Sequence, residues 1–337
     1  MKTAVVILNY NGAALLHDLL PKVVEFSPQA EVIVADNAST DDSLAVLRDE
    51  FPQVRLIQLE KNFGFAEGYN RALVQIDAEV FVLLNSDVEV TPNWLVPMVD
   101  YLEQHPEVAA CQPKLMSYNH RTQFEYAGAC GGQIDMLGYP FCRGRILDTV
   151  EEDRGQYDDV ADIFWATGAC LCIRADRFRE VGGLDGRFFA HMEEIDLCWR
   201  LGARGHRIVC VPQSVVYHIG AKTLNAESPF KTYLNFRNCA LMIYKNSLHA
   251  HSALFVRFWL DLVAALHLLL QRKPKNAAAV LRALHDFHRM RSDFKKDRAE
   301  NLKNTVVARP SGFFAGSILW QYYFRKRKVA RDLPKLG

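Results

Sequence analysis

Short apolar stretches and amphipathic stretches alternate along the first hundred residues of this 337-residue chain, with brief connections between them. Apolar runs bounded by turn-forming residues predict buried strands, and apolar residues spaced three and four apart predict amphipathic helices. Their alternation indicates an α/β domain with a mostly parallel central sheet and helices on both faces. The predicted strands are 3–8, 31–35, 54–59 and 80–84, and the predicted helices are 13–25, 42–50, 66–75 and 93–104.

The alternation stops near residue 117. Residues 117–159 are rich in glycine, tyrosine and charged side chains, so we expect an irregular loop or hairpin excursion that lies over the functional face of the domain. We then predict a strand at 169–173, helices at 175–181 and 193–204, and a strand at 207–211. From residue 230 the pattern is helical, which predicts an α/β domain, 1–245, and a helical C-terminal region, 246–337.

Composition narrows the class of protein. With 50% hydrophobic and 23% charged residues, the chain is expected to be globular with an ample core. A net charge of +1 argues against a nucleic-acid partner. The eight cysteines include no Cys-x-x-Cys pair, so we expect reduced core thiols. The first apolar run ends at Asn9, too early for a signal peptide, and therefore predicts a first strand in a cytoplasmic protein.

An apolar run that stops on a carboxylate marks the fourth predicted strand. Leu83 and Leu84 are followed at once by Asn85, Ser86 and Asp87. Open α/β folds bind their ligands at the carboxyl edge of the sheet, where this strand would end. Asp87 is therefore the first candidate for a metal ligand.

The loops after the first two strands carry groups that can bind a nucleotide. Asn9, Tyr10 and Asn11 offer amides and an aromatic face, and Asp36 can accept hydrogen bonds from a base or ribose. The structural interpretation is that Asp36 and Ser39 only turn the chain and cap the next helix. Taken alone, these residues favour the structural interpretation.

Two further segments have a functional and a structural interpretation. Asn62 and Gly64 begin a glycine-containing loop, but it lacks the spacing and position of a dinucleotide-binding fingerprint. Glu193, Glu194 and Asp196 begin a predicted helix, where the helix dipole by itself favours carboxylates. The acidic cluster is also a candidate for acid–base chemistry.

Taken in order, these segments resemble the family 2 glycosyltransferases with the GT-A fold, especially the bacterial rhamnosyltransferase-like members. The resemblance is collinear over roughly residues 3 to 245 and rests on 9–12, 36–41, 62–66, 84–87, 167–169 and 188–200, together with His218. It implies a Rossmann-like GT-A catalytic domain at 1–245 that uses a nucleotide-diphosphate sugar. It also implies an inverting enzyme that depends on Mg²⁺ or Mn²⁺.

The resemblance implies a role for each candidate. Asp87 and His218 correspond to metal ligands, and Glu194 corresponds to the catalytic base, where the family usually has Asp. Glu193 would bind acceptor hydroxyls, and the choice of base between Glu193 and Glu194 stays open. The implied donor-binding residues are Asn9, Tyr10, Asn11, Asp36, Asn62, Gly64, Asn85, Ser86 and Asp87. Trp165, Thr167 and Gly168 would face the acceptor, and Lys231 and Arg237 would contact phosphates.

The C-terminal region combines aromatic and basic residues. Trp320, Tyr323 and Phe324 precede the basic run 325–328, a combination that suits the surface of an anionic membrane. Packing of helices on the catalytic domain or on a second subunit explains it equally well. Arg257 and Asp261 interrupt the apolar stretch 253–270, so the sequence does not predict a transmembrane helix.

These expectations combine into one functional prediction. The chain would transfer a sugar, with rhamnose as the leading candidate by resemblance, to a saccharide or polyprenyl-diphosphate-linked acceptor in cell-surface polysaccharide synthesis. The alternative is a catalytically silent scaffold that binds nucleotide-sugars. The prediction places the protein in the cytoplasm or at the inner face of the membrane, as a monomer or homo-oligomer.

Overall fold

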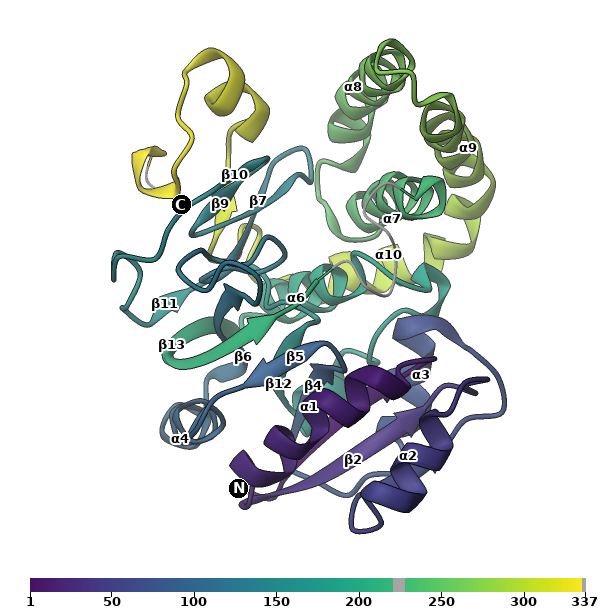
Figure 1. Ribbon diagram of the computed structural model, residues 1–337. Helices are drawn as coiled ribbons and strands as arrows, with labels where there is room; N and C mark the ends of the chain where they lie inside the picture. The colour runs from purple at the N-terminus through teal and green to yellow at the C-terminus, as the bar shows by residue number, and fades with distance from the viewer. Residues whose placement is uncertain (221–227, 335–337) are drawn as a thin grey trace.

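A central sheet with helices on both faces organises the first half of the chain in the computed structural model, which describes residues 1–220 and 228–334 (Figure 1). Its first strands are parallel, in the order β3-β2-β1-β4, and helices follow them as the sequence predicts. The strands are β1 (Thr3–Asn9), β2 (Ala30–Asp36), β3 (Arg55–Gln58) and β4 (Val80–Asn85), and the helices are α1 (Ala13–Phe26), α2 (Ser43–Glu50), α3 (Gly64–Leu73) and α4 (Val96–Gln104).

The other half of the sheet is mixed. β12 (Cys170–Arg174) runs antiparallel between β4 and β6 (Val108–Ser117), and β13 (Arg207–His218) is parallel to β6. Two short strands, β5 (Val88–Val90) and β11 (Ala161–Asp162), pair with β13 in the antiparallel sense. The predicted GT-A type of α/β fold is confirmed, although β6 and the second half of β13 were not predicted as strands.

The excursion expected at 117–159 builds a second, five-stranded sheet in the order β10-β9-β8-β7-β14. Its last strand comes from near the C-terminus and is parallel to β7. The strands are β7 (Gly132–Asp135), β8 (Pro140–Cys142), β9 (Arg145–Ile146), β10 (Thr149–Val150) and β14 (Phe313–Phe314). Residues more than 170 positions apart thus share one small sheet.

Helices α7 (Pro229–Asn246), α8 (Ala250–Leu270) and α9 (Pro274–Met290) stand beside the second sheet at one end of the molecule (Figure 1). The other helices of this half of the chain are α5 (Ala175–Glu180), α6 (Glu193–Ala203) and α10 (Lys295–Lys303). The region after α10 is not helical throughout, because β14 joins the second sheet and Phe314, Ile318 and Tyr322 pack against Phe141 and Ile146. The division at residue 245 remains a prediction.

Apolar side chains point alternately to the two faces of the central strands and form two hydrophobic cores, one on each face of the sheet. Val6 and Leu83 belong to one core, and Val5 and Val82 belong to the other. All eight cysteines are free and buried, which confirms the prediction of reduced core thiols. The sheet is therefore a rigid support for the loops at its carboxyl edge.

Candidate active site

The carboxyl ends of three parallel strands lie together at one edge of the central sheet. Asn9 at the end of β1 is in register with Asp36 of β2, and Leu8 is in register with Asn85 of β4. The chain turns immediately after Asn85 and places Asp87 before β5. The predicted donor residues after these strands therefore share one edge.

Hydrogen bonds fix the loops after β1 and β2 to each other. Asn9 Nδ2 donates to Asp36 Oδ1 at 3.1 Å, and the Ser39 amide donates to Asp36 Oδ2 at 2.9 Å. Asp36 is buried and turns the chain, as the structural interpretation expected. The ring of Tyr10 is 40% exposed beside these loops, and Asn11 Oδ1 accepts from the Thr40 amide at 2.7 Å. Tyr10 thus offers a free surface to a donor, and Asn11 and Asn62 are exposed as well.

The loop after β3 joins this edge to the turn before α6. Asn62 Oδ1 accepts from Asn37 Nδ2 at 3.1 Å, which ties the loop to β2. Gly64 has a φ of +76°, and a Cβ atom there would lie 2.4 Å from the ring of Phe189. The Phe65 amide also donates to the Phe189 carbonyl at 2.7 Å. Gly64 is therefore required for close packing between the donor-side loops and the turn 189–192.

Asp87 and His218 form a buried pair, as expected for residues with a shared role. His218 Nε2 lies 3.1 Å from Asp87 Oδ1, and His218 Nδ1 lies 3.4 Å from Glu125 Oε1. Burial acts to lower the pKa of His218, but the hydrogen bond to Asp87 and the charge of Glu125 outweigh burial and raise the pKa to about 10. The same histidine holds the pKa of Asp87 below its usual value against the effect of burial.

The donor set of this pair suits a hard divalent cation. A carboxylate and a neutral imidazole are ligands for Mn²⁺, and such cations complete their coordination with phosphate oxygens and water. Metal binding would therefore release the proton that His218 carries. The buried Nδ1 atom of His218 has no hydrogen-bond partner among the described residues. Within the same part of the chain, no group of three or more His, Cys, Asp or Glu side chains is arranged around a metal position. Asp87 and His218 could thus supply two ligands, and the remainder would come from the substrate and water.

Glu193 and Glu194 begin α6 after a turn with an unusual backbone. Phe189, His191 and Met192 have φ values of +68°, +69° and +72°. Such left-handed conformations in residues other than glycine are costly and cluster at functional sites. They place the first turn of α6, with both carboxylates, directly after the Phe189 carbonyl that receives the Phe65 amide.

Glu193 is buried and Glu194 is half-buried, and neither carboxylate is fully hydrogen-bonded. Glu193 Oε2 and Glu194 Oε2 are buried atoms with no partner among the described residues. Burial raises the pKa of Glu194 to about 7, although backbone amides that include the one of Gly168 act in the opposite direction. Burial and the neighbouring Glu194 raise the pKa of Glu193 well above its usual range, which favours its protonated form.

The predicted acceptor turn divides into a part at the site and a part in the core. Gly168 lies beside Glu194, because a Cβ atom built on it would be 4.0 Å from Glu194 Cβ. Thr167 Oγ1 donates to the Ala127 carbonyl at 2.6 Å and fixes this turn. Trp165 is only 3% exposed, and its indole N–H donates to the Gln133 carbonyl at 2.8 Å. The Trp165 ring therefore packs in the core beside the turn and has almost no exposed surface that an acceptor could contact.

Helix α7 holds the turn before α6 through its side chains. Asn238 Nδ2 donates to the carbonyls of Phe188, Ala190 and His191 at 3.0, 2.9 and 2.8 Å. Arg237 donates to the Phe188 carbonyl at 3.0 Å. Arg237 is thus committed to the backbone of the turn and is buried, which leaves it little access to a phosphate.

Lys231, at the start of α7, has a different environment. Burial lowers its pKa, and the charge of Glu125 acts in the opposite direction. Burial and Lys231 together lower the pKa of the neighbouring His191 to about 4. Lys231 has no ion pair within the ranges that the structure describes, so it remains a candidate for binding a phosphate. Lys231 interacts electrostatically with Glu125, next to His218, and with His191, next to Glu193. It therefore links the Asp87–His218 end of the site to the Glu193–Glu194 end.

A comparison with protein families decides the class of this site. Residues 4–144 match the family model described as Glycosyl transferase family 2. This segment, residues 4–144, belongs to glycosyl transferase family 2. This confirms the resemblance seen in the sequence.

Two bacterial relatives align with more than half of the chain. The chain is 30% identical over 204 residues to the O-antigen biosynthesis protein RfbC of Myxococcus xanthus. That alignment covers 60% of this chain and 16% of RfbC. The chain is also 30% identical over 203 residues to the N-acetylglucosaminyl-diphospho-decaprenol L-rhamnosyltransferase of Mycobacterium tuberculosis. That alignment covers 56% of this chain and 66% of the relative.

Solved structures support the GT-A fold over most of the chain. A mannosyltransferase from Pyrobaculum calidifontis, in complex with GDP-Man and Mn²⁺, superposes with a TM-score of 0.52 and 16% identity over 90% of this chain and 84% of its own. S. aureus TarS 1–349 in complex with UDP-GlcNAc superposes with a TM-score of 0.54 and 17% identity, over 90% and 89%. At these identities the likeness concerns the fold.

Two residues of the site were not found by reasoning from the sequence. Glu125 lies in the excursion 117–159, and its only signal is the contact with His218 across 93 positions in the chain. His191 lies within a segment that was singled out, but nothing local marks its imidazole. Both residues became visible only when the fold brought distant segments together.

Proposed function

We propose that this chain transfers a sugar from a nucleoside-diphosphate donor to a hydroxyl group of an acceptor, with inversion at the anomeric carbon. The observation that carries the proposal is the buried carboxylate of Glu194, whose pKa is about 7 and whose Oε2 atom has no partner among the described residues. A general base works best when its pKa is close to the working pH. The donor-side loops lie across the turn 189–192 from this carboxylate.

The chemistry follows from these two carboxyl groups. Ionised Glu194 takes the proton of the acceptor hydroxyl while that oxygen attacks the anomeric carbon, and the bond from this carbon to the diphosphate breaks. A single displacement of this kind inverts the configuration. Glu193, which remains protonated, can donate a hydrogen bond that orients the acceptor.

The charge that develops on the departing diphosphate needs stabilisation at the opposite end of the site. Asp87 and His218 would hold a divalent metal ion there, which acts as a Lewis acid toward the phosphate oxygens when it is bound. Lys231 adds a positive charge that is not neutralised by an ion pair in the described ranges. Its partial burial strengthens the interaction with a phosphate, because the effective dielectric constant is lower there.

The substrates are proposed from the relatives. The mycobacterial relative is named for transfer of L-rhamnose to a decaprenyl-diphosphate-linked N-acetylglucosamine. We therefore propose rhamnose, from dTDP-rhamnose, as the first sugar to test, and a polyprenyl-diphosphate-linked saccharide as the acceptor. Polysaccharide synthesis on the cytoplasmic side of the cell membrane is the matching process.

A thermal-shift titration tests donor binding. The purified chain is titrated with UDP, GDP, dTDP and CMP, each with and without Mn²⁺, because selective binding raises the apparent stability. We expect one nucleoside diphosphate to stabilise the protein in the presence of metal. Asp87→Ala should abolish the shift, whereas the matched variant Asp77→Ala, on an exposed side chain, should keep it.

The same proteins separate an enzyme from a scaffold. Glu194→Gln should still bind the nucleotide but lose transfer by a factor on the order of 10² to 10⁴. If the wild type bound the nucleotide but transferred no sugar from its nucleotide-sugar to any tested acceptor, the silent scaffold would be the better interpretation. Absence of any nucleotide response would contradict both.

A further inference from the structure

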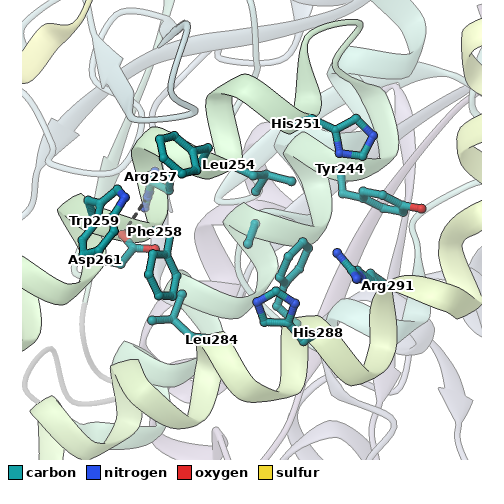
Figure 2. A pocket seen from close by; sticks show the side chains of 13 residues that line it. Tyr244, His251, Leu254, Arg257, Phe258, Trp259, Asp261, Leu284, His288 and Arg291 are labelled. Carbon is teal, nitrogen blue, oxygen red and sulfur yellow. Dashed lines mark hydrogen bonds and ion pairs between the residues drawn. The ribbon is translucent and has the colours of Figure 1, made fainter.

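Helix α8 has its polar and apolar faces reversed relative to an ordinary surface helix. Arg257 and Asp261 are buried and form an ion pair at 2.8 Å, shown by the dashed line in Figure 2. Arg257 Nη1 also donates to the Leu137 carbonyl at 3.0 Å, and its guanidinium stacks 3.9 Å from the centre of the Tyr139 ring. The helix is thus attached to the catalytic domain by its two charged residues.

The outer face of α8 is apolar instead. Phe255, Trp259, Val263, Leu266 and Leu270 are spaced three or four residues apart, and each is more than half exposed. A soluble helix normally turns such a stripe toward the core. Exposed apolar surfaces of this extent mark an interaction site.

A second exposed apolar segment lies at the same end of the molecule (Figure 1). The end of β7 and the turn after it contact both α8 and this segment. The Leu137 carbonyl accepts from Arg257 of α8, and Asp135 Oδ2 accepts from the Ile318 amide at 2.9 Å. Trp320 and Phe324, whose rings stack at 4.5 Å, follow Ile318 and are exposed. We call the outer stripe of α8 together with residues 320–324 the apolar face.

Basic side chains border the apolar face. Arg325, Lys326 and Lys328 are exposed directly after Phe324, and Arg272 is exposed just beyond the end of α8. Aromatic side chains next to lysine and arginine suit the interface of a membrane with anionic lipids. In a twofold dimer the same patch would face itself, so these positive charges would approach one another.

We propose that the apolar face docks this protein on the surface of an anionic membrane, with α8 in the plane of the interface. Among the described residues, α8 is the one helix long and apolar enough to cross a membrane by length and composition. Crossing would remove Arg257 and Asp261 from their bonds to the catalytic domain, whereas docking in the plane keeps those bonds. The inference stands on this surface and does not need the proposed reaction.

A cavity continues the apolar face into the protein. It has a volume of about 380 Å³ and lies between α7, α8 and α9, with Phe255 and Trp259 of the apolar face in its lining (Figure 2). Leu254, Phe258 and Leu284 line it as well. An acyl chain that left the bilayer at this point would meet apolar walls, which adds to the contact that α8 makes with lipid.

Tryptophan fluorescence of the full chain tests the proposal. Of the five tryptophans, Trp259 and Trp320 are exposed, whereas Trp94, Trp165 and Trp199 are buried. We expect a blue shift of the emission on addition of phosphatidylcholine vesicles that contain phosphatidylglycerol, and a much smaller shift with phosphatidylcholine alone. In the Trp320→Phe variant the shift should persist, because Trp259 still reports from α8.

Vesicle flotation with matched variants identifies the surface. Val263→Glu places a charge on the apolar face and should weaken binding by more than about tenfold, because burial of a valine side chain is lost. Val74→Glu, on an exposed valine of the catalytic domain, should have no effect. Each neutralisation among Arg325, Lys326 and Lys328 should weaken binding roughly fivefold at low salt. Circular dichroism verifies that the variants are folded.

Three results would overturn the proposal. The first is a wild type that binds neither kind of vesicle and shows no change in emission. The second is vesicle binding that Val263→Glu and Val74→Glu weaken equally, which would place the contact elsewhere. The third is a dimer, seen by sedimentation, that Val263→Glu dissociates while vesicles leave the wild-type emission unchanged; the apolar face would then be covered by a second copy.

Discussion

Replacing Glu194 by glutamine should stabilise the protein while it removes the base. Burial raises the pKa of Glu194 from an ordinary value of 4.5 to about 7. A group whose pKa is raised by folding contributes its full stability below the unfolded pKa and loses it as the pH rises through the folded pKa. Ionisation of this carboxylate therefore reduces the free energy of unfolding between about pH 4.5 and pH 7.

The size of the effect follows from the two pKa values. Each pKa unit corresponds to about 1.4 kcal/mol, so the cost of the ionised carboxylate reaches about 3 kcal/mol at pH 8. Glutamine keeps the shape of the side chain without the charge. Urea denaturation should therefore show Glu194→Gln more stable than the wild type by up to that amount at pH 8, and equal to it near pH 4.

A matched variant controls for the loss of one negative charge from the molecule. Glu60 is exposed and makes no ion pair in the described ranges, so Glu60→Gln should leave the free energy of unfolding unchanged at both pH values. The reasoning is refuted if Glu194→Gln is no more stable than the wild type at pH 8. It is also refuted if the difference between the two proteins does not depend on pH.

Two further substitutions test the support of the site. Gly64→Ala would place a Cβ atom 2.4 Å from the Phe189 ring at a positive φ, so we expect a loss of about 1–3 kcal/mol in the free energy of unfolding; an unchanged thermal midpoint would contradict this packing. Asp196 is buried and pairs with the buried Arg200 at 2.9 Å, so Asp196→Ala should cost about 3–5 kcal/mol by leaving this cation without its carboxylate partner. As a control, Asp49 forms an exposed ion pair with Arg48. Asp49→Ala should therefore lower the free energy of unfolding by less than about 1 kcal/mol in the same experiment.

The strands that were predicted correctly carry their signal locally. β1 and β4 are continuous apolar runs because both faces of these strands are covered, and each ends on a polar residue at the edge of the sheet. β6 is equally buried but contains Gln112 and Lys114. Lys114 pairs with Asp153 at 2.7 Å, and Gln112 accepts the Thr167 amide at 3.1 Å. These partners lie about 40 and 55 residues away, so the strand looked polar from its own sequence.

The site shows the same limit. Glu193 and Glu194 stand in a local motif, and both were predicted with the right surroundings at the start of a helix. Glu125 was not predicted, because only its contact with His218 in the folded protein marks it as part of the site. α8 shows a related limit: Arg257 and Asp261 interrupt an apolar run in the sequence, and only the structure shows that both side chains turn inward. The direction in which a charged side chain points depends on its partner, and the partners here are distant in sequence.

The pH dependence of sugar transfer is the most direct test of Glu194 as the base. It is measured as kcat/KM for the wild type and for Glu194→Gln, with the nucleotide-sugar whose nucleotide the titration selects. The wild type should lose activity as the pH falls through about 7, because protonated Glu194 cannot accept the acceptor proton. The variant should retain only weak activity without this limb. A variant with the same profile and similar activity would show that another group removes the proton.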